Sequence, residues 1–166
     1  MRECPNNIEE QRKFSLSGTN KTILIKTGTN SYYCGTICEK ELDKSIEEHK
    51  WKINILKSNN DIMVGLATSD YNVHSMNHET CGWYFNIHDS KLYSGPPFNY
   101  RGLKTNLSKV KDEIVVVMNM KKRTLKFIIN NEDKGDSYTN IPIDKPLFPD
   151  ISLSGKDNSV EISEID

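Results

Sequence analysis

The feature that most constrains the fold is an alternation with a period of two at residues 50–57, where the sequence reads KWKINILK. In an extended chain Trp51, Ile53 and Ile55 fall on one face, and polar side chains occupy most of the other. Such a pattern predicts a strand that is buried on one side and solvated on the other, as in an antiparallel sheet. The chain shows no long pattern with helical spacing, so we expect it to be built mainly from strands.

Other short apolar runs are separated by Gly, Asn, Asp and Ser, a spacing typical of a β-sandwich or barrel. We expect residues 50–57 and 62–67 to form one hairpin, because the Asn- and Asp-rich residues 58–61 between them favour a turn. A second hairpin is predicted from residues 114–120 and 124–129, joined by a basic turn and ended by another turn at 130–135. The remaining predicted strands are residues 22–26, 83–87, 91–94, 148–153 and 160–165.

Two segments are candidates for helices. Residues 8–12 are one, and residues 39–48 are the other, although the second is compatible with an irregular connection as well. We expect residues 1–13 to form a polar N-terminal tail and residues 14–166 to form one domain, because 166 residues suit a single core.

The charge distribution argues against a nucleic-acid partner. The chain has 22 basic and 23 acidic residues, interspersed along its length, and a formal net charge of −1. Proteins that bind nucleic acids concentrate positive charge to neutralise phosphates, and no such concentration is present.

No apolar run has the length of a signal peptide core or a membrane span. We therefore expect a monomer in the cytoplasm, with the nucleus as an alternative, whose four cysteines (Cys4, Cys34, Cys38 and Cys81) are free thiols.

A series of motifs resembles the SPRY domain, from Trp51 to about Ile162. In order they are Trp51 with residues 62–68, residues 82–85 (GWYF), residues 91–95, residues 112–119, residues 124–131 with Gly135, and residues 147–153. This resemblance implies an all-β fold, a two-layer antiparallel β-sandwich of SPRY type. Large aromatic residues fill the space between two sheets, so we expect Trp51 and Trp83 to be core residues. Gly65 suggests a close approach by a backbone or side chain of the facing sheet.

The resemblance also implies a protein–protein interaction module, an adaptor or scaffold that recognises a peptide or a protein surface through its loops. Loops suit this role because they vary while the sheets hold them in place. The candidate loops are residues 29–33, 58–61, 69–81 and 154–158, together at one end of the sandwich. Tyrosine is favoured in such loops because it offers a large contact at low entropic cost. The predicted partner-binding residues are Tyr32, Tyr33, Asn59, Asn60, Tyr71, His74, His78, Ser154 and Lys156.

Three other functions compete with this hypothesis. A carbohydrate-binding, lectin-like module is the main alternative, because related sandwiches bind sugars by stacking an exposed aromatic ring beside polar groups. A structural domain that contacts its neighbours through a sheet face is another. An enzyme is disfavoured because no phosphate-binding loop, nucleophile elbow or metalloprotease motif is present. The Cys and His pairs lie too far apart for a zinc finger, so we predict no metal. We also predict no catalytic residues and no cofactor.

Overall fold

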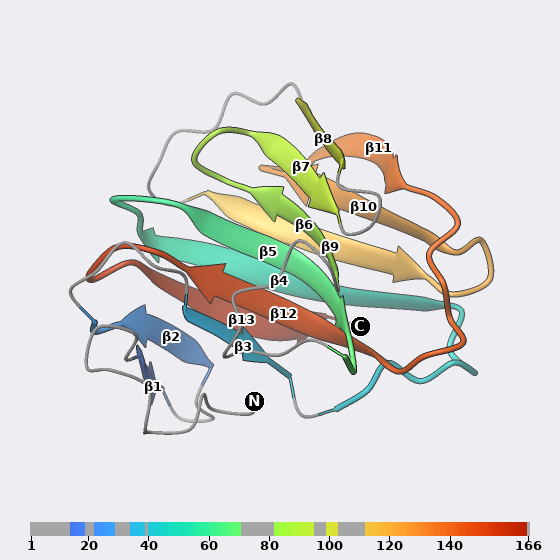
Figure 1. The fold of residues 1–166 in the computed structure, drawn as a ribbon, viewed down its shortest axis with the longest axis horizontal. Coiled ribbons are helices and arrows are strands. Elements are labelled where there is room, and N and C mark those ends of the chain that lie inside the picture. Colours follow the sequence, from blue (N-terminus) through green and yellow to red (C-terminus); the bar gives the residue numbers. More distant parts are fainter. Residues whose placement is uncertain are drawn as a thin grey trace.

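The computed structural model of the chain describes residues 14–18, 22–28, 34–38, 40–70, 82–94, 99–102 and 112–165, and these form strands, turns and irregular connections (Figure 1). In these described residues, thirteen strands make two antiparallel sheets that pack face to face. The seven-stranded sheet has the order β1 (Phe14–Ser17), β2 (Ile23–Lys26), β13 (Ser159–Ile165), β4 (Glu48–Lys57), β9 (Glu113–Asn119), β10 (Thr124–Ile129) and β11 (Glu132–Tyr138). The six-stranded sheet has the order β3 (Cys34–Ile37), β12 (Leu147–Leu153), β5 (Ile62–Thr68), β6 (Gly82–Asn86), β7 (Lys91–Ser94) and β8 (Asn99–Gly102). The predicted two-layer antiparallel β-sandwich is confirmed.

The space between the sheets is filled by alternate side chains of both layers. Trp51 on β4 is 3% exposed, and Ile53 and Ile55 follow it into the same core. From the other sheet Phe85 on β6 packs against Phe127 on β10, with ring centroids 5.5 Å apart. Trp83 is half-buried and packs against this core as well, so both tryptophans occupy the interior positions expected of them.

The six-stranded sheet is also buried on its outer face, where a polar layer forms. Asp150 on β12, Gly65 on β5 and Tyr84 on β6 lie opposite one another across three adjacent strands. Asp150 and Tyr84 are both fully buried. A Cβ atom at Gly65 would lie 2.0 Å from the carbonyl oxygen of Trp83. The prediction that the facing sheet approaches Gly65 is wrong, because the approaching backbone belongs to β6, the neighbouring strand of the same sheet.

The hairpin predicted from residues 50–57 and 62–67 is wrong. Both strands exist, but β4 belongs to the seven-stranded sheet and β5 belongs to the six-stranded sheet. Residues 58–61 therefore cross from one layer to the other. The hairpin of β9 and β10 is confirmed, with Asn119 opposite Thr124. The turn predicted at 130–135 is shorter than expected, since β11 already begins at Glu132.

Four strands were not predicted: β1, β3, β8 and β11. The first three are only four residues long, and β11 has the sequence EDKGDSY, which lacks an apolar alternation because it is an edge strand. The predicted helix at 39–48 is also wrong for residues 40–47, which form turns and an irregular connection up to the start of β4. The predicted helix at 8–12 lies outside the described residues. No helix in the described part of the chain is long and apolar enough to cross a membrane.

Candidate functional site

Two connections cross between the sheets side by side at one end of the sandwich, and we call them the paired loops. Residues 58–61 run from β4 to β5, and residues 154–158 run from β12 to β13. They lie together because β12 pairs with β5 and β13 pairs with β4, so that Leu153 stands opposite Ile62 and Ser159 opposite Lys57. The antiparallel register of both sheets therefore positions the two loops against each other.

The side chain of Asn158 holds the paired loops together from inside. It is fully buried, and its Oδ1 accepts a hydrogen bond from the backbone N–H of Asn59 at 2.6 Å. Its Nδ2 donates to the carbonyl oxygens of Asn60 at 3.2 Å and Asp61 at 3.4 Å, and to the carbonyl of Ser154. One amide thus satisfies polar groups of both loops, which is what fixes a buried turn in a single conformation.

Two further contacts set the shape of residues 154–158. Gly155 has φ +79° and Asp157 has φ +69°, which lie in the left-handed region that favours glycine, asparagine and aspartate. A Cβ atom at Gly155 would come within 2.7 Å of the Cβ of Asn60 in the other loop. The backbone N–H of Ser154 donates to the carbonyl of Asp61 at 2.9 Å. The loops therefore touch through backbone atoms as well as through Asn158.

The turn between β6 and β7, residues 87–90, is attached to the same end. Asn86 is buried, and its Nδ2 donates to the Asp61 carboxylate at 3.3 Å while its Oδ1 accepts from the backbone N–H of His88 at 2.9 Å. Because Asp61 is only partly buried, this contact links the outside of the paired loops to the six-stranded sheet. His88 is exposed beside them.

The outer surface of the paired loops is polar with one apolar side chain. Asn59 and Lys156 are exposed, and Leu56 next to them is 43% exposed at an irregularity where β4 and β13 change register. Lys57 and Asp157 form an exposed ion pair at 3.2 Å. A partner would therefore meet amide and ammonium groups and one exposed leucine, on a backbone that is already fixed.

The structure brings together those predicted site residues that it describes. Asn59, Asn60, Ser154 and Lys156 all belong to the paired loops. Ser154, however, is 1% exposed, so its side chain supports the loop and is not presented to a partner. Tyr32, Tyr33, Tyr71, His74 and His78 lie outside the described residues.

The four candidate loops were expected at one end of the sandwich, but the described strand ends that flank one of them, residues 69–81, lie at the other end. Thr68 stands opposite Leu147 and Ala67 opposite Gly82, so the described ends of β5 and β6 that flank residues 71–81 lie at the end away from the paired loops. Asn158 was not singled out by sequence reasoning. Its partners in the other loop are 97 to 99 residues away, and no local pattern marks an asparagine that will be buried.

Among the described residues, few side chains are arranged in a way that suits catalysis or metal binding. No group of three or more His, Cys, Asp and Glu side chains among them could hold a metal ion. Asp150 is the most unusual acid, since burial raises its pKa to about 7 while Tyr84 and the backbone N–H of Ile151 lower it less strongly. It lies within the six-stranded sheet and has no access to solvent.

Comparisons with known proteins agree with this architecture. The SPRY domain model matches residues 48–164 of the chain. Among solved structures the chain is similar to the SPRY domain of human HERC1, with a TM-score of 0.74, 21% identity, and coverage of 92% of this chain and 93% of that one. It is also similar to another human SPRY domain, with a TM-score of 0.73, 18% identity, and coverage of 90% and 93%. No curated protein matches the chain.

Proposed function

The chain belongs to the SPRY domain family, and from this premise we propose that it binds a partner protein through the paired loops, as an adaptor or scaffold. SPRY domains are generally protein–protein interaction modules. The observation that carries the proposal is the Asn158 network, which holds exposed Asn59 and Lys156 on a fixed backbone. A fixed loop loses little conformational entropy on binding, so that more of the contact energy appears as affinity.

The surface chemistry favours a polar peptide or protein patch as the ligand. Amide side chains and the Lys156 ammonium supply hydrogen bonds, and Leu56, at the end of β4, supplies an apolar contact. A sugar site would need an exposed aromatic ring for stacking. Among the described residues the exposed large hydrophobic side chains are Ile46, Leu56 and Ile165, none of which is aromatic. We therefore prefer a protein ligand to a glycan.

The test compares three baits in a pull-down from the source cell, read by mass spectrometry. The first is the unchanged protein, the second carries Asn59→Ala and Lys156→Ala, and the third carries Lys121→Ala and Lys122→Ala in the exposed β9–β10 turn. The third is the control, because it removes lysines away from the paired loops. We expect a protein that is recovered by the first and third baits and lost from the second.

Two results would count against this function. If all three baits recover the same proteins in equal amounts, the paired loops do not contact the partner. If the purified domain retains no protein but binds defined oligosaccharides on a glycan array, the module is a lectin. Reconstitution of the identified partner with the purified domain then separates direct from indirect capture.

A further inference from the structure

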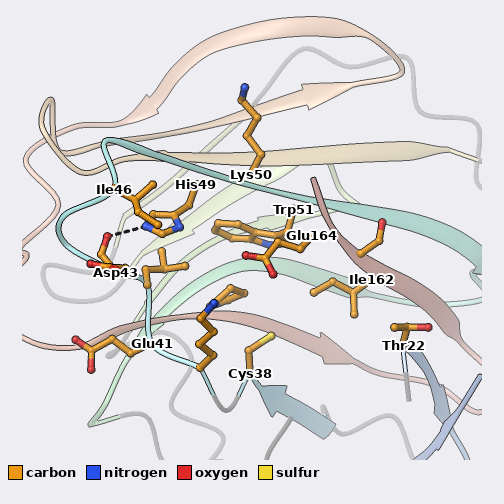
Figure 2. Close-up of a pocket in the computed structure, with 14 residues that line it drawn as sticks. Thr22, Cys38, Glu41, Asp43, Ile46, His49, Lys50, Trp51, Ile162 and Glu164 are labelled. Carbon is orange, nitrogen blue, oxygen red and sulfur yellow. Dashed lines mark hydrogen bonds between the residues drawn. The ribbon is translucent and has the colours of Figure 1, made fainter. Parts of the chain in front are cut away.

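A pocket of about 280 Å³ opens between the two sheets at the end away from the paired loops (Figure 2). One wall comes from β4 and β13, and the opposite wall comes from Pro149 on β12 and from Cys38 after β3. The connection through residues 40–46, which crosses from the six-stranded to the seven-stranded sheet, forms its lip. Its volume is close to the smallest that ligand-binding pockets in proteins usually have.

The interior of the pocket is apolar and its lip is held in place. Leu42, Trp51 and Ile162 are buried core residues that also line it, and Ile46 stands at the lip with 47% of its surface exposed. Asp43 anchors the lip through its carbonyl oxygen, which accepts hydrogen bonds from the backbone N–H of Ile46 at 3.1 Å and from His49 Nε2 at 2.8 Å. The pocket is therefore a formed feature with exposed apolar surface at its entrance.

The charged side chains around the pocket are unequally engaged. Lys50 forms an ion pair with Glu48 at 3.1 Å, and Figure 2 shows its side chain directed away from the pocket. The Asp43 carboxylate accepts two hydrogen bonds from Ser45, which lower its pKa. The carboxylates of Glu41 and Glu164 have neither an ion pair nor a hydrogen bond with any described residue, and the same holds for the ammonium of Lys40. Two free carboxylates against one free ammonium leave the entrance with an excess of negative charge.

Glu164 and Trp51 lie at the centre of this arrangement. They stand opposite each other on β13 and β4, so both side chains lie on the inner face of the sheet. Figure 2 shows the Glu164 carboxylate directed toward the indole ring. The indole Nε1 is buried and has no hydrogen-bond partner in the described part of the chain. An aromatic ring next to a free carboxylate, above an apolar cavity, is suited to an alkyl chain that ends in a cation.

We propose that this pocket is a second binding site, which accepts a lysine side chain presented by a partner protein. The four-carbon stem lies against Leu42, Ile46 and Ile162, and the ammonium group meets the Glu164 carboxylate at the entrance. Glu41 adds a second negative charge on the lip. The site does not depend on the paired loops, since it shares no residue with them and lies at the other end of the sandwich.

The indole N–H signals of Trp51 and Trp83 allow a direct test by NMR of the ¹⁵N-labelled domain. The probes are three capped tripeptides with lysine, norleucine or glutamate between two alanines. Norleucine keeps the stem of lysine and removes its charge, and glutamate reverses the charge. We expect the lysine peptide to shift the Trp51 signal in a saturable way, with Trp83 as the internal reference. Because the carboxylates are exposed, norleucine is expected to bind about two- to fivefold more weakly, and glutamate more weakly still.

Charge variants of the protein complete the test. Glu164→Gln is expected to reduce the affinity for the lysine peptide by about two- to fivefold and to leave norleucine binding unchanged. Asp136→Asn, which removes one exposed negative charge from β11 and does not line the pocket, should change neither. The proposal is overturned if the Trp51 signal does not respond to the lysine peptide. It is equally overturned if lysine and norleucine bind alike, or if Glu164→Gln and Asp136→Asn have the same effect.

Discussion

The buried side chain of Asn158 accepts a hydrogen bond at 2.6 Å from the backbone N–H of Asn59, a residue 99 positions earlier in the chain. This contact joins two connections that each run from one sheet to the other. The rigidity of the proposed binding surface depends on it.

Replacing Asn158 by alanine should lower the free energy of unfolding by about 1–3 kcal/mol, because it leaves the N–H of Asn59 without its acceptor and removes one donor from each of the carbonyls of residues 60, 61 and 154. Urea denaturation followed by tryptophan fluorescence measures the change. Asn59→Ala is the matched control, since the exposed side chain is removed and the backbone N–H remains. Equal stability of the two variants would show that the network does not hold the loops.

Gly155→Ala should be more harmful than Gly135→Ala. Both glycines have positive φ, +79° and +74°, so both substitutions carry the backbone strain of about 1–2 kcal/mol. At Gly155 the new methyl group also meets the Cβ of Asn60 at 2.7 Å, whereas nothing lies within 4 Å at Gly135. The difference between the two variants in denaturation isolates the contact between the paired loops. If both lose the same stability, the loops are free to move apart.

The Asp150 carboxyl should make the domain less stable as the pH rises. Burial raises its pKa to about 7 in the folded state, from 3.8 in the unfolded chain. Between these values the folded protein holds a proton that the unfolded chain has lost, so the stabilisation is complete below about pH 4 and disappears as the pH approaches 7. The full effect is on the order of 4 kcal/mol.

Asp150→Asn tests this prediction, because an amide keeps the shape and cannot ionise. Denaturation at intervals from about pH 5 to about pH 8 should show a steep fall in stability for the unchanged protein and a flatter curve for the variant. Asp144→Asn, at an exposed position, should leave the slope unaltered. A slope that survives in Asp150→Asn would assign the pH dependence to another group.

Tyr138→Phe should destabilise the packing of the two sheets. The Tyr138 hydroxyl, on β11 of the seven-stranded sheet, lies 2.8 Å from the carbonyl oxygens of both Tyr84 and Tyr93 in the six-stranded sheet, which share its single hydrogen. Its loss leaves both acceptors without this donor and is expected to cost about 1–3 kcal/mol. Thermal unfolding measures the effect. A melting temperature equal to that of the unchanged protein would mean that water replaces the hydroxyl.

The sequence predicted individual strands well where one face is buried. β4 and β9 are examples. The apolar residues alternate in β4 and run continuously in β9. In a strand with one buried face, a shift of register by one residue would turn the apolar side chains toward solvent. β11 was missed because an edge strand needs no apolar face. The assignment of β4 and β5 to different sheets could not be predicted either, since residues 58–61 have the composition of a hairpin turn. Residues 59–61 instead cross between the sheets, where they are bonded by Asn158, about 100 residues further along.

Contacts between distant parts of the chain also limited how much of the site could be predicted. Asn59 and Lys156 were identified because turn residues are exposed, a local property. The buried position of Ser154 and the central place of Asn158 depend on how β12 and β13 pair with β5 and β4, which is a property of the whole sandwich.

The pairing of residues 58–61 with residues 154–158 also bears on the order of events during synthesis. Contacts between distant parts of a chain form slowly, because a long loop must close before they bring any gain. On the ribosome the first of these loops emerges about 100 residues before the second. A nascent chain that ends before Asn158 lacks the side chain that orders Asn59 and Asn60, so it has no completed binding surface. The proposed recognition activity therefore requires synthesis to pass Asn158, and before that point the paired loops offer a partner no completed surface.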